Sequence, residues 1–366
     1  MAEPVLDTAI DALLTPPAFG ATAADRAAGL TPVLEALTAH HLARCPEYAH
    51  VTAAAFPGWQ PTGVAADLPF VPIGLFKRRD LRSVADGEVF KVLTSSGTSG
   101  ATVSRVALDR TTAKRQTRAL TLVLQHVLGA ARRPMLVIDS EAVVRNRSEL
   151  SARAAGVVGM MSFGRHHTFA LDADMRPRLE AIRQFLSDHA GQELLIFGFT
   201  FMVWQHLVNE LGDYDLDLGA ATVIHSGGWK RLAAEQVTNE EFKRCLREAF
   251  GIERVHNFYG MAEQVGSVFL EGTDGRLHPA RFADVIVRDP DTWQELPAGE
   301  PGVLQVLSAV PTSYPGHSIL TEDLGVVDSI DGPGSEHGGK AFRVLGRVPQ
   351  AELRGCSDTY ASALGR

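Results

Sequence analysis

Cysteine is scarce in this sequence, and the cysteines that it has lie far apart. The 366 residues include three, Cys45, Cys245 and Cys356, and no two of them form a CxxC pair. This spacing excludes a zinc-ribbon type of site and a disulfide framework. A few scattered thiols are typical of proteins in a reducing compartment, so we expect a cytoplasmic protein.

Long apolar segments and blocks of one charge are missing as well. The stretch ELLIFGFTFMVW at 193–204 is too short to cross a bilayer. The first residues, MAEPVLDTAIDALL, contain no basic region ahead of an apolar run, so we expect no signal peptide. The formal net charge of -8 at pH 7 gives no reason to expect nucleic acid or an anionic membrane as a partner.

The sequence also lacks the short motifs of several common enzyme classes. No glycine-rich stretch continues into Lys-Ser or Lys-Thr as in a Walker phosphate loop, and no GxGxxG follows a strand-like segment. A GxSxG segment, which marks many serine hydrolases, is absent. No HxxxH pair or His/Cys group supports a set of metal ligands.

Apolar periodicity indicates an α/β protein. Residues 5–50 carry apolar side chains at helical spacing, and from about 111 to 260 segments with helical spacing alternate with short apolar runs typical of buried strands. Such alternation predicts a parallel, doubly wound sheet with helices on its faces. After about residue 265, short strand-like segments separated by Gly, Pro and Asp predict a smaller, mostly antiparallel β region. We expect residues 328–342 to form an exposed loop.

This organisation predicts one large domain and a short tail. The large domain would span residues 1–345, with an α/β nucleotide- and acid-binding core at about 60–265 and a β-rich region at 266–345. Residues 346–366 would form a hinge-like tail.

A loop rich in hydroxyls and glycine, LTSSGTSG, lies between two strand-like segments. Glycines let a backbone approach a ligand closely, hydroxyls donate hydrogen bonds, and successive backbone N–H groups can hold an anion. The loop therefore suits a phosphate, although a polar hairpin would have the same composition. Its candidate ligand-binding residues are Thr94, Ser95, Ser96, Gly97, Thr98, Ser99 and Gly100.

Two further motifs follow strand-like segments, and α/β sheets bind ligands at the carboxyl ends of their strands. In VIHSGGWK, Ser226, Gly227 and Gly228 either allow close approach to a flat ligand or make a plain strand-to-helix turn. In NFYGMAEQVGS, Glu263 either holds hydrated Mg²⁺ through one carboxylate or marks a helix N-terminus. The other candidate residues of this motif are Tyr259, Gly260, Met261 and Ala262.

The segment RVPQAELRGCSD places a cysteine close to a cation near the end of the chain. Cys356 follows Arg354 by two residues, and a nearby positive charge favours the nucleophilic thiolate over the thiol. Cys356 is therefore a candidate nucleophile, although an inert thiol under a terminal segment is the plainer interpretation.

Taken in order, these motifs resemble those of the adenylate-forming superfamily of acyl- and aryl-acid ligases. The resemblance implies a loop that holds the phosphates of ATP, a Gly-Gly stretch and an aromatic residue that border adenine, and a glutamate that binds magnesium. It also implies an aspartate that holds the ribose, here in LTEDLG, and a hinge arginine. The corresponding residues are Ser95 to Gly100, Gly227, Gly228, Tyr259, Glu263, Asp323 and Arg347.

A narrower resemblance is to the LuxE-like acyl-protein synthetases of the bacterial luciferase system. VPIGLFKRRDLRSV followed by LTSSGTSG, and GRVPQAELRGCSD near the end, are similar to signatures of that branch, and the match spans about residues 65–360. The resemblance implies ATP and Mg²⁺ as cofactors, formation of an acyl-adenylate, and a thioester on Cys356. It further implies an acceptor protein such as a reductase. The oligomeric state stays open, with a homodimer as one option.

The chain departs from the superfamily in its cationic residues. The loop lacks the usual lysine, for which Arg105 is one candidate replacement, and only 19 residues follow Arg347. We therefore expect no room for the C-terminal domain that carries a catalytic lysine, and Lys77 and Lys230 become candidate cations. The alternative to an enzyme is a non-catalytic nucleotide- or acid-binding protein, or a partner subunit of a reductase.

The acid is predicted only as a class. Apolar and aromatic segments suit an aryl acid or a fatty acid. Some relatives of the LuxE-like branch occur in natural-product pathways and resemble activators of phenazine carboxylates. In SFGRHHTF, Arg165 and His166 are candidates to meet a second carboxylate of such an acid. The predicted pocket residues are Phe163, Arg165, His166, Phe199 and Phe201.

Overall fold

The structure, a computed structural model, describes residues 3–94, 103–145, 152–229, 236–332 and 336–348. The chain forms two compact units. The first unit holds residues 1–126 and 260–366, and the second unit holds residues 127–259.

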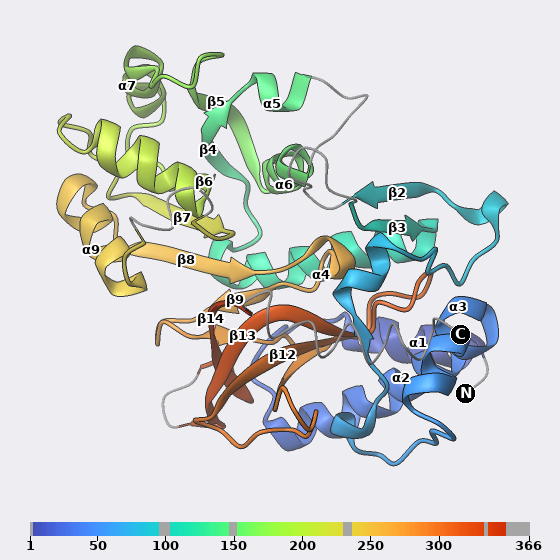
Figure 1. Cartoon of the computed structure of the whole chain (residues 1–366). Helices are drawn as coiled ribbons and strands as arrows, with labels where there is room; N and C mark the ends of the chain where they lie inside the picture. The colour runs from blue at the N-terminus through green and yellow to red at the C-terminus, as the bar shows by residue number, and fades with distance from the viewer. Residues whose placement is uncertain (1–2, 95–102, 146–151, 230–235, 333–335, 349–366) are drawn as a thin grey trace. The chain divides into compact units, whose positions relative to one another are not determined.

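The second unit is a parallel sheet with helices between its strands (Figure 1). Its strands lie in the order β5-β4-β6-β7-β8, and each neighbouring pair is parallel. The strands are β4 (Arg133–Ser140), β5 (Gly164–Leu171), β6 (Leu194–Phe199), β7 (Ala221–Ser226) and β8 (Arg254–Tyr259). The helices are α5 (Ala142–Arg145), α6 (Ala152–Met161), α7 (Leu179–Asp188), α8 (Thr200–Met202), the π-helix η4 (Val203–Asn209) and α9 (Asn239–Phe250).

Both faces of this sheet are buried, as expected for a parallel sheet. One apolar core joins the sheet to α7, η4 and α9, and it includes Leu136, Ile196, Val223, Phe185, Leu207 and Leu246. The alternate strand positions, which point to the other face, are buried as well, among them Met135, Leu195 and Ile224. The predicted alternation of helices and strands and the parallel sheet are thereby confirmed.

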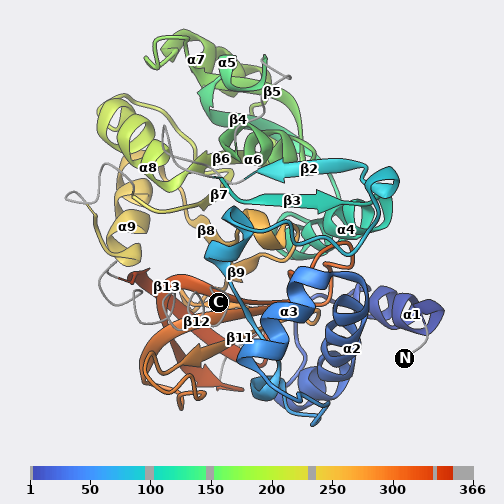
Figure 2. The same ribbon diagram turned by 45° about the vertical axis from the view of Figure 1, so that its right-hand side comes forward.

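The first unit combines N-terminal helices with mostly antiparallel strands (Figure 2). Its helices are α1 (Glu3–Leu13), α2 (Ala23–Arg44), α3 (Pro46–Ala55), most of α4 (Arg110–Leu128), and the short helices η1 (Ala65–Asp67), η2 (Ile73–Lys77), η3 (Asp86–Glu88) and η6 (Ala262–Gln264). Helix α2 packs against both α1 and α3.

The strands of the first unit lie in the order β11-β12-β13-β14-β10-β9, with β1 parallel to β13. A separate ribbon pairs β2 with β3. The bounds are β1 (Val71–Pro72), β2 (Lys91–Thr94), β3 (Arg105–Leu108), β9 (Phe269–Glu271), β10 (Leu277–His278), β11 (Ala283–Arg288), β12 (Pro301–Ser308), β13 (Ser318–Ile330) and β14 (Lys340–Arg347).

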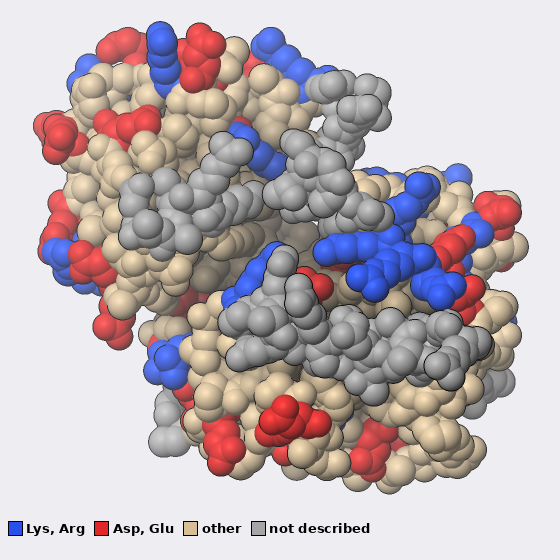
Figure 3. Space-filling view, viewed as in Figure 1, with Lys and Arg blue, Asp and Glu red and all other residues tan. Residues whose placement is uncertain are grey.

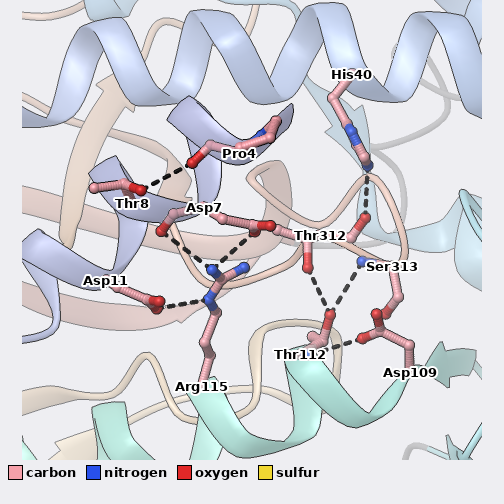
Figure 4. Close-up of polar contacts among 10 residues, drawn as sticks. All are labelled: Pro4, Asp7, Thr8, Asp11, His40, Asp109, Thr112, Arg115, Thr312 and Ser313. Atoms are coloured by element: carbon pink, nitrogen blue, oxygen red, sulfur yellow. Dashed lines mark hydrogen bonds and ion pairs between the residues drawn. The ribbon is translucent and has the colours of Figure 1, made fainter. Parts of the chain in front are cut away.

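A buried arginine ties α4 to α1 in the first unit (Figure 4). The side chain of Arg115 is 5% exposed, and its nitrogens lie 2.8 Å from Asp7 Oδ1 and 3.0 Å from Asp11 Oδ1. One turn earlier, the Thr112 hydroxyl lies 2.8 Å from the Thr312 hydroxyl and accepts the Ser313 N–H at 3.2 Å. These contacts hold the first turns of α4 against both α1 and the loop after β12.

A cluster of neutral polar side chains lies in the core, where α2 packs against the segments that carry Ser83 and His317. The rings of His41 and His317 stack at 4.9 Å, and both side chains are fully buried. His41 Nδ1 lies 2.8 Å from the Ser83 hydroxyl, and His317 Nε2 lies 2.9 Å from the Thr38 hydroxyl. Burial lowers the pKa of both imidazoles, that of His317 to about 3, so both rings are neutral at pH 7.

Two expectations about the fold meet exceptions. The prediction of an exposed loop over 328–342 is wrong at both ends, because β13 runs to Ile330 and β14 begins at Lys340 and the two strands pair there. Strand β5, from Gly164 to Leu171, was not expected.

No described helix is long and apolar enough to cross a membrane.

Candidate functional site

In the second unit, the motif residues line up at the carboxyl ends of the strands. Phe199 at the end of β6 is in register with Ser226 at the end of β7, and Ser226 is in register with Phe258 of β8. Gly227 and Tyr259 follow directly, and Gly227 has a φ of +83°, which favours glycine. The strand order therefore brings HSGG and NFYG together at the carboxyl ends of neighbouring strands, where parallel sheets bind ligands.

The ring of Phe199 lies between two glycines at this edge. A β-carbon built on Gly156 of α6 would lie 3.0 Å from Phe199 Cζ, and one built on Gly227 would lie 3.4 Å from Phe199 Cδ1. Phe201 is half-buried in α8 and packs on the core. Phe199 is thus the predicted pocket residue that contacts the Gly-Gly turn.

The other predicted pocket residues lie at the amino ends of the strands in the second unit's sheet, away from the carboxyl ends. Arg165 is in register with Pro134 near the start of β4, and β5 runs parallel to β4, so Phe163, Arg165 and His166 lie at the amino ends of the strands. Arg165 there donates hydrogen bonds to the carbonyl of Arg132 at 3.1 Å and to Gln192 Oε1 at 2.7 Å. The structure does not bring these residues together with Phe199, and the reason is the unexpected strand β5.

In the first unit, the segment after β8 is anchored around Glu263. Gly260 and Met261 lead into η6, in which Ala262 precedes the glutamate. Gln264 donates to the carbonyls of Val306 at 3.0 Å and Gly316 at 2.8 Å. These two bonds attach η6 to β12 and to the segment before β13, so the backbone around Glu263 has little freedom.

Gly266 allows the same segment to approach α4. Its φ is +90°, and a β-carbon there would lie 2.4 Å from the Gln116 carbonyl oxygen. Only glycine fits so close to another backbone in this conformation. The end of the NFYGMAEQVGS motif thus has a packing role that sequence patterns did not indicate.

Glu263 is a buried carboxylate with a defined electrostatic environment. Its residue is 3% exposed, and burial raises the pKa of its carboxyl. The Ser104 hydroxyl and the positive charge of Lys77 lower the pKa, and the negative charge of Glu322 raises it. Residues of β13, η2 and the segment before β3 therefore set the electrostatic environment of Glu263 in η6.

Asp323 and Arg347 face each other across paired strands. Asp323 of β13 is in register with Arg347 of β14, and Asp323 Oδ1 lies 3.9 Å from Arg347 Nε. The arginine side chain is 82% exposed, whereas that of the aspartate is 23% exposed. The Thr321 hydroxyl accepts the Asp323 N–H at 3.1 Å and donates to the Leu304 carbonyl at 2.8 Å, which fixes the turn of the TED segment.

The described residues include the flanks of the Ser/Thr/Gly loop. Thr94 is exposed at the end of β2 and pairs with Arg105 at the start of β3. Ser104, just after the loop, is the residue whose hydroxyl lowers the pKa of Glu263. Residues 95–100, Lys230 and Cys356 lie outside the described residues.

Sequence patterns missed Ser104, Glu322 and Gln264 as parts of this site. All three stand inside or next to the motifs, in SGATVSRV, LTEDLG and YGMAEQ. Their side-chain contacts join residues more than 40 positions apart, as when Gln264 bonds to Val306 and Gly316. The only signal in the sequence for these three residues is that they stand in or next to a motif. That position does not indicate which side chain of the motif points into the protein.

Comparison with known proteins gives solved structures of the same fold. A 2-hydroxyisobutyryl-CoA ligase in complex with 2-HIB-AMP and CoA is 17% identical, with a TM-score of 0.66 over 92% of this chain and 78% of that one. The same ligase in the postadenylation state has a TM-score of 0.68 at 18% identity, over 91% of this chain and 70% of that one. At this identity the likeness establishes the fold, which is that of the adenylate-forming enzymes.

Curated relatives and a family match define the chain more narrowly. It is 22% identical to a long-chain-fatty-acid--luciferin-component ligase of Aliivibrio fischeri and 24% identical to one of Vibrio harveyi. Each alignment covers 81% of this chain, with 79% and 78% of the relatives. Residues 26–365 match the family described as acyl-protein synthetase, LuxE. The chain therefore belongs to the LuxE acyl-protein synthetase family and is an acid-activating ligase.

Proposed function

We propose that this ligase uses ATP to convert a carboxylic acid into an acyl-adenylate and pyrophosphate. An oxygen of the acid forms a bond to the α-phosphorus of ATP while the bond from that phosphorus to the pyrophosphate oxygen breaks. Pyrophosphate leaves with the bonding electron pair. Because little covalent chemistry falls to the protein, its contribution is positioning and stabilisation of negative charge.

The surroundings of Glu263 are the observation that carries the proposal. A buried carboxylate is kept within the electrostatic reach of Lys77 and of Ser104, which follows the Ser/Thr/Gly loop by four residues. Burial of a carboxylate costs free energy, so a purely structural role would favour a neutral side chain here. A site for a cation and phosphates explains why the fold retains the charge.

Glu263 suits Mg²⁺ in the form in which proteins usually hold it with nucleotides. The described residues contain no group of three or more His, Cys, Asp or Glu that could enclose a metal ion. One carboxylate, completed by water and phosphate oxygens, is the usual donor set for Mg²⁺ in phosphate sites. The ion would neutralise charge on the phosphates.

The remaining roles follow the resemblance to the adenylate-forming ligases. We assign the phosphates to Ser95 to Gly100, the adenine to Gly227, Gly228 and Tyr259, and the ribose to Asp323. Arg347, which is exposed beside Asp323, is free of the core and can turn toward a bound nucleotide. Phe199, at the Gly-Gly turn, is proposed to contact the acid.

After adenylation, we propose transfer of the acyl group to Cys356. The thiolate would attack the acyl carbon and release AMP, which leaves a thioester for an acceptor such as a reductase. The acid is an aryl acid, such as a phenazine carboxylate, or a fatty acid, the substrate class in the names of the two curated relatives. A partner subunit that only holds an acid for a reductase is the rival function.

Release of pyrophosphate tests the proposal. Wild type and Cys356→Ala are supplied with ATP, Mg²⁺ and a panel of aryl and fatty acids. We expect acid-dependent release by both proteins in the first turnover, and an acylated protein only with wild type. No release with any acid, despite ATP binding by calorimetry, would favour the rival function.

A further inference from the structure

The short helix η2 is firmly attached to the first unit and ends in an exposed lysine. Leu75 and Phe76 are buried, and the Phe76 ring meets Tyr314 edge to face at 6.1 Å. The Leu75 carbonyl accepts the N–H groups of Arg78 and Arg79, each at 2.9 Å, which closes the end of the helix. The backbone of Lys77 is therefore fixed, while its side chain extends to the surface.

Helix η2 lies against the elements that carry the candidate phosphate site. It contacts β13 and β3. A β-carbon on Gly74 would lie 3.6 Å from Glu322 Oε1, so the helix passes directly over the TED segment. The charge of Lys77 also reaches Glu263, on which it acts together with Ser104. Strand β3 contacts both η2 and η6, so Lys77 and Glu263 belong to helices that pack on the same strand.

Two nearby arginines are engaged in ion pairs, in a region where lysine and arginine side chains gather over η2 and the β2–β3 ribbon (Figure 3). Arg79 lies 3.7 Å from Glu47 of α3, and Arg82 lies 2.8 Å from Asp80. Lys77 forms no ion pair with any residue in the described part of the chain. The Ser/Thr/Gly loop contains no lysine of its own. A cation that acts on Glu263 and has no ion-pair partner among the described residues is suited to bind an anion.

We propose that the Lys77 ammonium binds the phosphates of ATP beside Glu263 and stabilises the charge that develops as the acid attacks the α-phosphorus. This inference rests on the proposed function. Lys77 keeps its proton throughout, since the step breaks only the bond between the α-phosphorus and the departing pyrophosphate oxygen.

Replacement of Lys77 tests the inference through both binding and rate. Lys77→Met keeps the apolar stem and removes the charge, Lys77→Arg keeps the charge, and Arg78→Ala removes the exposed cation next in the chain. We measure ATP binding by calorimetry, and kcat and KM for ATP in acid-dependent pyrophosphate release. For Lys77→Met we expect ATP affinity to fall about tenfold and kcat about 100-fold, similar to the loss of one transition-state donor. Lys77→Arg should recover much of both, and Arg78→Ala should stay within twofold of wild type.

The two measurements separate this inference from the proposed function. Wild-type affinity and kcat in Lys77→Met would overturn the role of Lys77 and leave adenylation intact. If wild type binds ATP but releases no pyrophosphate, the reaction is wrong, and the binding comparison still decides whether Lys77 holds phosphate. An equal loss in Lys77→Met and Arg78→Ala would also overturn it, because a general surface charge would then explain the effect.

Discussion

At the scale of single residues, the function proposed for Glu263 requires a buried charge, and that charge has a cost in stability. Burial holds the pKa of its carboxyl above the ordinary 4.5. The unfolded chain therefore ionises more readily, and the free energy of unfolding falls as pH rises from the unfolded pKa through the folded one. Above both values the destabilisation is complete, so it is present at pH 7.5 and absent at pH 4.

Glu263→Gln is predicted to lose activity and gain stability. The amide keeps the size and shape of the side chain, and it removes a buried charge. We expect the rate of pyrophosphate release to fall about 100-fold, and the thermal midpoint to rise at pH 7.5 but not at pH 4. Glu271→Gln, at another buried glutamate of the first unit, should change the rate less than threefold. Equal rate losses in both variants would contradict a specific role of Glu263 in the reaction.

The residue scale also marks the limit of sequence reasoning about the site. The motif series led to Glu263, Asp323 and Arg347, and the structure places the last two in register on neighbouring strands. The electrostatic effects of Ser104 and Lys77 on Glu263 span about 160 and 190 positions. Such contacts depend on how η2, β3 and η6 pack, and packing leaves no periodic signal in a single sequence.

At the scale of helices and strands, the tie between α1 and α4 gives a stability prediction. Arg115 is buried and bonded to two aspartates of α1, whereas Arg145 at the end of α5 pairs with Glu141 just before that helix and is 72% exposed. Removal of a buried, hydrogen-bonded cation leaves its partners without compensation. We expect Arg115→Ala to lower the free energy of unfolding by about 2 kcal/mol and Arg145→Ala by less than about 0.5 kcal/mol, measured by urea unfolding. Equal effects would show that the tie contributes little.

Elements buried on both sides were the ones that the sequence predicted best. Strand β6 reads LLIFGF, a continuous apolar run, because helices cover both faces of the sheet. The first half of strand β5, GRHH, is polar and partly exposed. It therefore lacks the continuous apolar run that marks β6 as a strand. The π-helix η4 was expected only as a helix over 200–211, because side-chain periodicity does not distinguish the wider turn.

At the scale of the whole molecule, buried neutral histidines predict sensitivity to acid. Burial lowers the pKa of His317 and of His225 to about 3, and that of His41 well below its ordinary 6.5. Below pH 6.5 the unfolded chain binds protons that the folded chain does not. Each such histidine then lowers the free energy of unfolding by about 1.4 kcal/mol per pH unit, down to its folded pKa.

His317→Gln isolates one of these contributions, because glutamine can keep the hydrogen bond to Thr38. Between pH 6 and pH 4.5, we expect its unfolding free energy to fall less steeply than that of wild type, by about 1.4 kcal/mol per pH unit. An NMR titration of wild type should find the His317 ring neutral at pH 5. Parallel pH profiles together with a protonated ring at pH 5 would contradict the account.

Adenylation, the central claim, is tested most directly by following isotopic oxygen from the acid. The best acid of the panel is labelled with ¹⁸O in both carboxylate oxygens and incubated with the protein, ATP, Mg²⁺ and hydroxylamine to trap the activated acyl group. If the acid attacks the α-phosphorus, mass spectrometry will find one ¹⁸O in the AMP released. Unlabelled AMP, or label in inorganic phosphate together with ADP, would contradict the acyl-adenylate and with it the function proposed for this chain.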